Sequence, residues 1–304
     1  MKIGFLFPGQ GSQSVGMGKD LYDKYDEIKK VYDDASRITG IDIADLTFNS
    51  SEEVLFQTKN TQIAILIMSL GILKVLEKNN IKPDYAAGLS LGEYTALICG
   101  KALSFEDGVK IVQKRGELMQ EYVPEGNWLM AAILGLDDNK VEEVCRNVKS
   151  GFVVPANYNC TGQVAISGDE KGIKEAEILA KEAGARKVSI LKTNGPFHTE
   201  KLSNASKYLK QELEKIQIKC PEINIVKNID ATPYKEDDNI VEILSNHVTN
   251  PVRFTNSIKY MLDNGVDTFI EIGPGKTLTS FVKRISREVK LVNINSVETL
   301  EEFL

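Results

Sequence analysis

The sequence contains little histidine, little tryptophan and no closely spaced cysteine. Only two histidines, His198 and His247, and one tryptophan occur among the 304 residues. The four cysteines lie far apart and form no C-x-x-C pair, so neither a zinc site nor a disulfide framework is indicated, which fits a reducing cytoplasm. Any histidine that acts as a general base must therefore be one of these two residues.

Long apolar runs and an excess of positive charge are also missing. The N-terminal MKIGFLFPGQ lacks the long apolar core of a signal peptide. The most apolar later segment, 63–76, is interrupted by Ser69, Gly71 and Lys74 and predicts a buried helix instead of a membrane span. With 37 Lys and Arg against 43 Asp and Glu, the net charge is −6, which offers no overall attraction to nucleic acid or to an anionic membrane. We expect a cytoplasmic protein and favour a monomer, because no heptad or long apolar surface stripe is present.

The first 124 residues alternate between strands and helices. The patterns predict strands at 2–7 and 84–89 and helices at about 20–38, 62–79, 92–99 and 105–122. Such alternation is typical of a parallel sheet covered by helices on both faces. The same pattern returns after residue 194, with predicted helices at 199–215 and 254–264 and a strand at 268–272.

The intervening segment has a different order. It predicts β-α-β-β-α-β, with strands at 129–136, 151–158, 163–167 and 187–191 and helices at 138–148 and 170–183. This order is typical of a ferredoxin-like unit. We therefore expect an α/β-hydrolase-like large domain, formed by residues 1–124 and 195–304, with a ferredoxin-like small domain, 125–194, inserted between its two segments.

A G-x-S-x-G pattern, Gly88-Leu89-Ser90-Leu91-Gly92, lies between a predicted strand and a predicted helix. In a sharp strand-to-helix turn the serine adopts a strained backbone conformation, and side chains at both flanking positions would collide. The gain is an exposed hydroxyl at a helix N-terminus, which favours developing negative charge. We interpret Ser90 as a nucleophile, with an ordinary turn as the alternative.

A serine hydroxyl needs a neighbouring base to take its proton. His198 follows Asn194-Gly195-Pro196-Phe197 at the start of a predicted helix, where a functional side chain can project from a loop. A solvated or capping histidine is the alternative there. His247 ends a helical stretch before Pro251, where a structural role and a functional role are equally compatible with the sequence.

Arg115 lies near the middle of the apolar half of the helix predicted after Phe105. A buried guanidinium without a partner would carry a desolvation penalty of several kcal/mol. It therefore needs a carboxylate, supplied either by an Asp or Glu of the protein or by a substrate. The planar fork of arginine donors suits a bidentate carboxylate.

Two glycine-containing segments match nucleotide-binding motifs only in part. Gly9-Gln10-Gly11 follows a strand, but Ser14 stands where the dinucleotide fingerprint needs glycine. Gly275-Lys276-Thr277 resembles the end of a phosphate-binding loop, but Ile270 stands where that loop needs its first glycine. The sequence therefore predicts neither a dinucleotide cofactor nor ATP binding.

Six motifs together resemble the malonyl-CoA:acyl carrier protein transacylase family, in the family's order and over nearly the whole chain. They are Phe7-Pro8-Gly9-Gln10-Gly11-Ser12-Gln13, Gly88-Leu89-Ser90-Leu91-Gly92-Glu93-Tyr94, Gln113-Lys114-Arg115-Gly116, Gly195-Pro196-Phe197-His198, Asn250-Pro251-Val252 and Glu271-Ile272-Gly273-Pro274-Gly275.

The resemblance implies a ping-pong transfer in which Ser90 takes the malonyl group from coenzyme A and passes it to the phosphopantetheine thiol of acyl carrier protein. By position, His198 is similar to the family's base, and Arg115 is similar to the residue that binds malonate's free carboxylate. The backbone N–H groups of Gln10 and Leu91 would form the oxyanion hole. The resemblance implies no bound cofactor and no metal, since the coenzyme A thioester is a substrate.

The resemblance also assigns two further roles and exposes two departures. The backbone carbonyl of His247 would orient His198, and Phe197 would line the acyl pocket, as in malonyl-selective members. The family usually has glutamine at the position of His247 and histidine at the position of Leu89. The first departure leaves the carbonyl contact unchanged, whereas the second removes a histidine beside the nucleophile.

Several alternatives remain open at this stage. A serine hydrolase or thioesterase could form the same Ser90 ester, and a non-catalytic docking module could keep the fold. Fatty-acid synthesis is the expected pathway, with a trans-acting acyltransferase of a polyketide synthase as the alternative. Because the carrier protein is expected to be acidic, four lysines are candidates for its docking face: Lys187, Lys192, Lys207 and Lys210.

Overall fold

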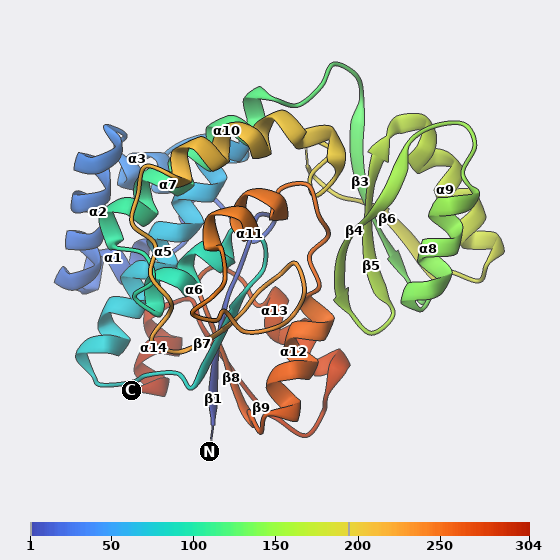
Figure 1. Cartoon of the computed structure of the whole chain (residues 1–304). Helices are drawn as coiled ribbons and strands as arrows, with labels where there is room; N and C mark the ends of the chain where they lie inside the picture. The colour runs from blue at the N-terminus through green and yellow to red at the C-terminus, as the bar shows by residue number, and fades with distance from the viewer. Residues whose placement is uncertain (1, 194) are drawn as a thin grey trace.

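A computed structural model describes residues 2–193 and 195–304 of the chain and contains two separate sheets (Figure 1). The first is parallel and has the strand order β7-β2-β1-β8-β9. Its strands are β1 (Ile3–Phe7), β2 (Tyr85–Gly88), β7 (Asn224–Val226), β8 (Thr268–Ile272) and β9 (Lys290–Ile294). The chain reaches this sheet both before and after the segment that forms the second sheet, as the sequence predicts.

Helices cover both faces of the parallel sheet, as expected for parallel strands. Phe5 and Phe7 of β1 belong to the core beneath α5 and α6, whereas Leu6 points to the opposite core, which α12 and α13 cover. The helices of this part are α1 (Lys19–Lys24), α2 (Asp26–Thr39), α3 (Ile43–Phe48), α4 (Glu52–Leu55), α5 (Thr58–Lys78), α6 (Gly92–Cys99), α7 (Phe105–Glu121), α10 (Ser203–Leu213), α11 (Ile240–His247), α12 (Phe254–Asp263), α13 (Thr277–Ile285) and α14 (Val297–Phe303).

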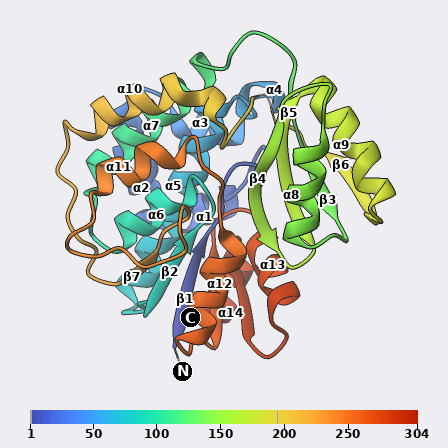
Figure 2. The same cartoon turned by 45° about the vertical axis from the view of Figure 1, so that its right-hand side comes forward.

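The second sheet is antiparallel and has the strand order β4-β5-β3-β6. Its elements are β3 (Trp128–Leu134), α8 (Asp138–Asn147), β4 (Val153–Cys160), β5 (Gln163–Asp169), α9 (Glu170–Glu182) and β6 (Lys187–Ile190). The two helices pack on one face of the sheet, at the right of Figure 1, and turning the molecule by 45° keeps them on the outside (Figure 2). The order β-α-β-β-α-β that the sequence predicts is confirmed.

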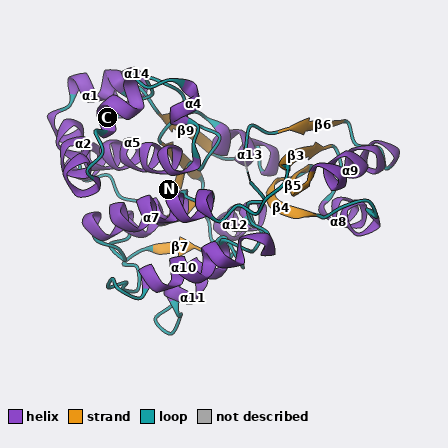
Figure 3. Ribbon diagram, turned by 90° about the horizontal axis from the view of Figure 1, so that it is seen from above, coloured by secondary structure: helices purple, strands orange, loops and turns teal. Residues whose placement is uncertain are grey.

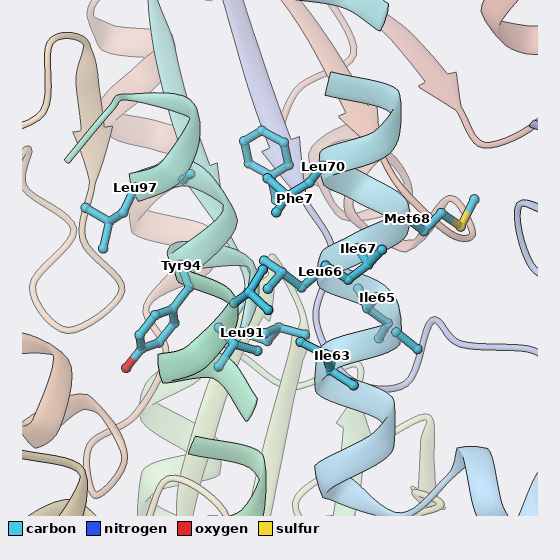
Figure 4. Close-up of a cluster of buried hydrophobic side chains, with 14 of the residues drawn as sticks. Phe7, Ile63, Ile65, Leu66, Ile67, Met68, Leu70, Leu91, Tyr94 and Leu97 are labelled. Atoms are coloured by element: carbon cyan, nitrogen blue, oxygen red, sulfur yellow. The ribbon is translucent and has the colours of Figure 1, made fainter. Parts of the chain in front are cut away.

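The longest helix among the described residues, α5, runs through the centre of the larger part. Viewed from above, it lies alongside α7 (Figure 3). Phe7, Leu91 and Tyr94 lie on one side of α5, whereas Ile65 and Met68 point to the other side (Figure 4). Its length and composition would allow it to cross a membrane, but 83% of its most apolar stretch is buried inside the protein. The prediction of a buried helix at 63–76 is thus confirmed.

The structure corrects several predicted boundaries. The helix predicted over 20–38 is two helices, because Tyr25 takes an extended conformation and packs against the core. The helix predicted at 199–215 begins with a 3₁₀ turn, Glu200–Leu202, and its α-helical part ends at Leu213. The strands predicted at 129–136 and 151–158 are shifted to Trp128–Leu134 and Val153–Cys160.

Candidate active site

Ser90 lies in a sharp turn between β2 and α6. Its φ of 53° is in the left-handed region, which a residue with a side chain adopts at an energetic cost. A Cβ on Gly88 would lie 1.9 Å from the carbonyl carbon of Gly92, and a Cβ on Gly92 would lie 2.0 Å from the carbonyl oxygen of Phe7. The steric reason for glycine at both positions, inferred from the sequence, is confirmed.

The Ser90 hydroxyl is the meeting point of two side chains from distant parts of the chain. Its Oγ lies 2.9 Å from Nε2 of His198 and accepts a hydrogen bond from Nη2 of Arg115, also at 2.9 Å. Of the two histidines, His198 is therefore the one within reach of the Ser90 proton. Arg115 comes from α7, and His198 lies in the loop that precedes the 3₁₀ turn.

His198 is held in one orientation by two backbone carbonyls. Its Nδ1 lies 3.0 Å from the carbonyl oxygen of His247 and 3.1 Å from that of Asn250. Two acceptors at Nδ1 place the proton of the neutral ring there and leave Nε2 free to accept the Ser90 proton. Burial, and secondarily the charge of Arg115, lower the pKa of His198 to about 4, so the ring is neutral near pH 7.

The side chain of Arg115 is buried, with 1% of its surface exposed. Its Nη1 donates to Oε1 of Gln62 at 2.6 Å, and the guanidinium carbon lies 5.4 Å from the centre of the Tyr94 ring. Within residues 2–193 and 195–304, no Asp or Glu forms an ion pair with this guanidinium, and its Nε has no hydrogen-bond partner. Burial lowers its pKa. Of the two alternatives that the sequence leaves open, an internal carboxylate is therefore excluded for the described residues.

The glycine-rich loop after β1 approaches the serine turn closely. A Cβ on Gly9 would lie 2.3 Å from the carbonyl oxygen of Leu89, so glycine is required for this approach. Gln10 and Leu91 border the same cavity as Ser90. In the described part of the chain, no hydrogen-bond acceptor faces the backbone N–H of either residue. Two free N–H donors beside a nucleophile are what an oxyanion hole requires.

A cavity of about 460 Å³ lies between the two sheets, with Ser90, His198 and Arg115 in its wall. Phe197, with 5% of its surface exposed, and Leu89 also line it. The antiparallel sheet contributes mainly apolar residues and two buried amides of β4. The apolar residues are Met130, Ala132, Ala165 and Ile190, and the amides are Asn157 and Asn159, whose Oδ1 atoms have no partner among the described residues.

Sequence reasoning missed a polar cluster beneath the serine. Glu93 is buried, and its Oε1 accepts hydrogen bonds from the Tyr234 hydroxyl at 2.7 Å and from the backbone N–H of Asn228 at 3.3 Å. Its Oε2 lies 3.2 Å from Nδ1 of His247. Burial raises the pKa of Glu93 to about 7 and lowers that of His247 well below its usual value, so this contact is not a pair of opposite charges at neutral pH. Glu93 directly follows the G-x-S-x-G pattern, which was the one available signal in the sequence.

The four candidate lysines for carrier docking are not equivalent. Lys187, Lys192 and Lys207 are exposed, and Lys192 also borders the cavity. Lys210 on α10 pairs with Glu242 of α11. Its positive charge is therefore already partly compensated within the protein.

The comparisons with known proteins agree with one another. The acyl transferase domain family matches residues 4–300. The chain is 43% identical over 302 residues to the malonyl CoA-acyl carrier protein transacylase of Bacillus subtilis (strain 168), covering 99% of this chain and 95% of that protein. It is 39% identical to the protein of the same name from Staphylococcus aureus (strain MRSA252), covering 99% and 97%.

Solved structures give the same result. The malonyl CoA-acyl carrier protein transacylase of Clostridium perfringens superposes with a TM-score of 0.95 at 44% identity, covering 100% of this chain and 96% of that chain. A malonyl-transacylase in complex with a type II polyketide synthase acyl-carrier protein superposes with a TM-score of 0.95 at 34% identity, covering 99% and 98%. The chain therefore belongs to the acyl transferase family and, within it, to the malonyl CoA-acyl carrier protein transacylases.

Proposed function

We propose that this chain transfers a malonyl group from coenzyme A to the phosphopantetheine thiol of acyl carrier protein through an ester on Ser90. The observation that carries the proposal is the buried Arg115 guanidinium, which reaches the Ser90 hydroxyl inside the cavity at 2.9 Å and has no carboxylate partner among the described residues. An acyl group that ends in a carboxylate would supply that partner.

In the first half-reaction, His198 takes the Ser90 proton while Oγ attacks the thioester carbonyl. The negative charge that forms on the carbonyl oxygen is stabilised by the backbone N–H groups of Gln10 and Leu91, and loss of one such donor costs about 3 kcal/mol. When the intermediate collapses, the carbon–sulfur bond breaks, and the coenzyme A sulfur takes the proton from His198. The products are malonyl-Ser90 and free coenzyme A.

In the second half-reaction, the thiol of the carrier protein gives its proton to His198 and attacks the ester carbonyl. The bond between the carbonyl carbon and Oγ then breaks, and Ser90 recovers its proton from His198. The backbone carbonyl of His247 keeps Nδ1 of His198 protonated in both steps. All of these proton transfers use groups of this chain and of its two substrates.

The strand order and the helix positions support a more specific assignment of the two domains. If the four strands of the second sheet are numbered by their order along the chain, they lie side by side as 2-3-1-4, and both helices pack on one face. This arrangement supports a ferredoxin-like small domain at 125–194. The parallel sheet with a serine turn after β2 supports an α/β-hydrolase-like large domain at 1–124 and 195–304. The cavity between the two sheets would then be an interdomain site, with Phe197 in its acyl pocket.

Malonyl-CoA and acyl carrier protein are the proposed partners, with no cofactor, and the proposed setting is fatty-acid synthesis by a cytoplasmic monomer. One observation favours a second setting. The similar malonyl-transacylase described above was solved with a carrier protein of a polyketide synthase. A polyketide assembly line is therefore the second candidate, with the same chemistry.

The proposal is tested by offering water and acyl carrier protein together to the malonyl-labelled enzyme. We expect Ser90 to be labelled by malonyl-CoA, no labelling of Ser90→Ala, and malonyl carrier protein as the main product by mass spectrometry. Predominant release of free malonate would instead establish a hydrolase. A native protein that is not labelled at all would establish a non-catalytic docking module.

A further inference from the structure

Asn228 lies beneath the serine turn, two residues beyond the end of β7. It is buried, with 1% of its surface exposed. Its backbone N–H donates to Glu93 at 3.3 Å, and its carbonyl accepts a hydrogen bond from the backbone N–H of Arg253 at 2.8 Å. The main chain of Asn228 is therefore fixed on both sides.

The side-chain amide of Asn228 binds the serine turn at two points. Its Oδ1 accepts a hydrogen bond from the backbone N–H of Ser90 at 2.7 Å, and its Nδ2 donates to the carbonyl oxygen of Gly88, also at 2.7 Å. Both groups belong to a segment in which Ser90 has a φ of 53°. One planar amide thus fixes the backbone at the strained residue and two residues before it.

This arrangement continues the β2–β7 ladder beyond its last regular pair. The register runs to Ala87 opposite Val226, where β7 ends, and β2 ends one residue later at Gly88, which still pairs with Phe7 of β1. In a parallel ladder, one residue bonds to a carbonyl and an N–H that flank a single residue of the partner strand. The Asn228 amide binds the same two groups around Leu89, while the N–H of Leu89 donates to Phe7 of β1 at 3.0 Å. The serine turn is therefore held from both neighbouring strands.

We propose that Asn228 is a positioning residue for the nucleophile: its side-chain amide holds Gly88 and Ser90 so that Oγ stays between His198 and Arg115. The inference rests on the proposed role of Ser90. It also explains why Ser90 contributes no N–H to the proposed oxyanion hole, since that N–H is already bound to Asn228.

The test compares the native enzyme with Asn228→Ala and Asn228→Asp. An ionised aspartate keeps the acceptor for the Ser90 N–H but loses the donor to the Gly88 carbonyl. Two rates are measured: acylation by malonyl-CoA or acetyl-CoA in a single turnover, and labelling of Ser90 by a small fluorophosphonate. A misplaced nucleophile loses rate by about 100-fold. We expect that loss in Asn228→Ala for all three reagents, with an unchanged preference for malonyl over acetyl. The Kd of malonyl-CoA, measured in a Ser90→Ala background, is expected to be unchanged.

Asn293→Ala is the matched control. Asn293 lies on β9 of the parallel sheet, and its amide donates to Glu271 at 3.0 Å and to Thr279 at 2.7 Å, away from the serine turn. We expect this variant to keep native labelling rates. Labelling of folded Asn228→Ala or Asn228→Asp within about twofold of native would overturn the inference, as would an equal loss in Asn293→Ala. If Asn228→Ala does not fold, Asn228→Asp, which preserves the side-chain volume, decides. Failure of the native enzyme to label with fluorophosphonate would instead remove the proposed function.

Discussion

The two walls of the cavity present different kinds of groups. The wall on the parallel-sheet side carries Ser90, Arg115 and His198, each held by at least one hydrogen bond to a side chain or a backbone carbonyl. The wall on the antiparallel-sheet side is mainly apolar and contains the side-chain amides of Asn157 and Asn159. We infer that the first wall carries out the chemical steps and selects the acyl group, and that the second mainly holds the rest of the substrate.

Replacement of the base should produce the largest effect among the predictions that probe this division. We expect His198→Ala to lower kcat/KM for malonyl transfer by about 10³-fold, because general base catalysis contributes roughly 10²–10⁴-fold. In the native enzyme only the neutral ring accepts the Ser90 proton, so kcat/KM should fall as the pH decreases through about 4. A pH series on both proteins checks this. An acid limb centred at 6.5, the value of an unperturbed histidine, or a native limb that persists in His198→Ala, would contradict the assignment.

Removal of the guanidinium should reduce malonyl transfer much more than acetyl transfer. We expect Arg115→Ala to reduce kcat/KM for malonyl-CoA by about 100-fold, because loss of one partner from a buried charge pair costs 2–5 kcal/mol or more, roughly. Acetyl transfer lacks the carboxylate and should change much less. Because the charge of Arg115 contributes to the low pKa of His198, the acid limb of acetyl transfer should also move to higher pH.

Lys114→Ala provides the control for that experiment. Lys114 is the neighbouring residue on α7, and it is exposed and pairs with Glu117 at 2.9 Å. Removal of the Lys114 side chain should leave kcat/KM for malonyl and acetyl transfer unchanged, and the acid limb of the pH profile should stay in place. Equal losses of malonyl and acetyl transfer in Arg115→Ala would show that the guanidinium serves only to hold Ser90 and does not select the substrate.

Ser90, His198 and Arg115 could be predicted from the sequence because the patterns that mark them are local. Ser90 is marked by glycines two residues away on each side, and Arg115 by the period of one helix. Asn228 could not be found in this way. The strand that precedes it, β7, has only three residues, and Asn228 meets the serine turn only because β7 pairs with β2, which lies about 140 positions earlier in the chain.

Prediction of the fold from the sequence also succeeds only where the signals are local. The order of the six elements of the antiparallel sheet is correct because each element has its own periodicity and turn residues. The break at Tyr25 was missed because no proline or glycine marks it, and an aromatic residue that packs against the core fits a helical pattern equally well. Gln62 was missed as a partner of Arg115 because its position within α5 gives no indication of the contact with α7.

The amides of the antiparallel sheet should affect binding more than turnover. We expect Asn159→Ala to raise KM for malonyl-CoA by about three- to tenfold, since a neutral hydrogen bond contributes roughly 1 kcal/mol. Asn159 borders the cavity, where its side-chain amide can form a hydrogen bond with an amide group of the pantetheine arm. Labelling of Ser90 by a fluorophosphonate, which has no such arm, is the internal control and should stay at the native rate. A fall in kcat with an unchanged KM would break the division between the two walls.

Replacement of His247 should have the smallest effect, although its imidazole lies close to the catalytic ring. The ring centres of His198 and His247 are 4.8 Å apart, but the contact made to His198 is through the backbone carbonyl, which every residue supplies. Burial keeps the His247 ring neutral, and its Nδ1 faces Glu93. A glutamine supplies the same backbone carbonyl to His198 and a polar side chain beside Glu93, so we expect His247→Gln to keep kcat/KM within about twofold of native and to keep the same acid limb. His247→Leu places an apolar side chain beside the buried Glu93 carboxyl and should lower the free energy of unfolding by about 1–3 kcal/mol with little change in kcat. A tenfold loss of kcat in His247→Gln at unchanged Tm would show that the imidazole itself takes part in proton transfer, and the parallel-sheet wall would then contain a second titrating histidine.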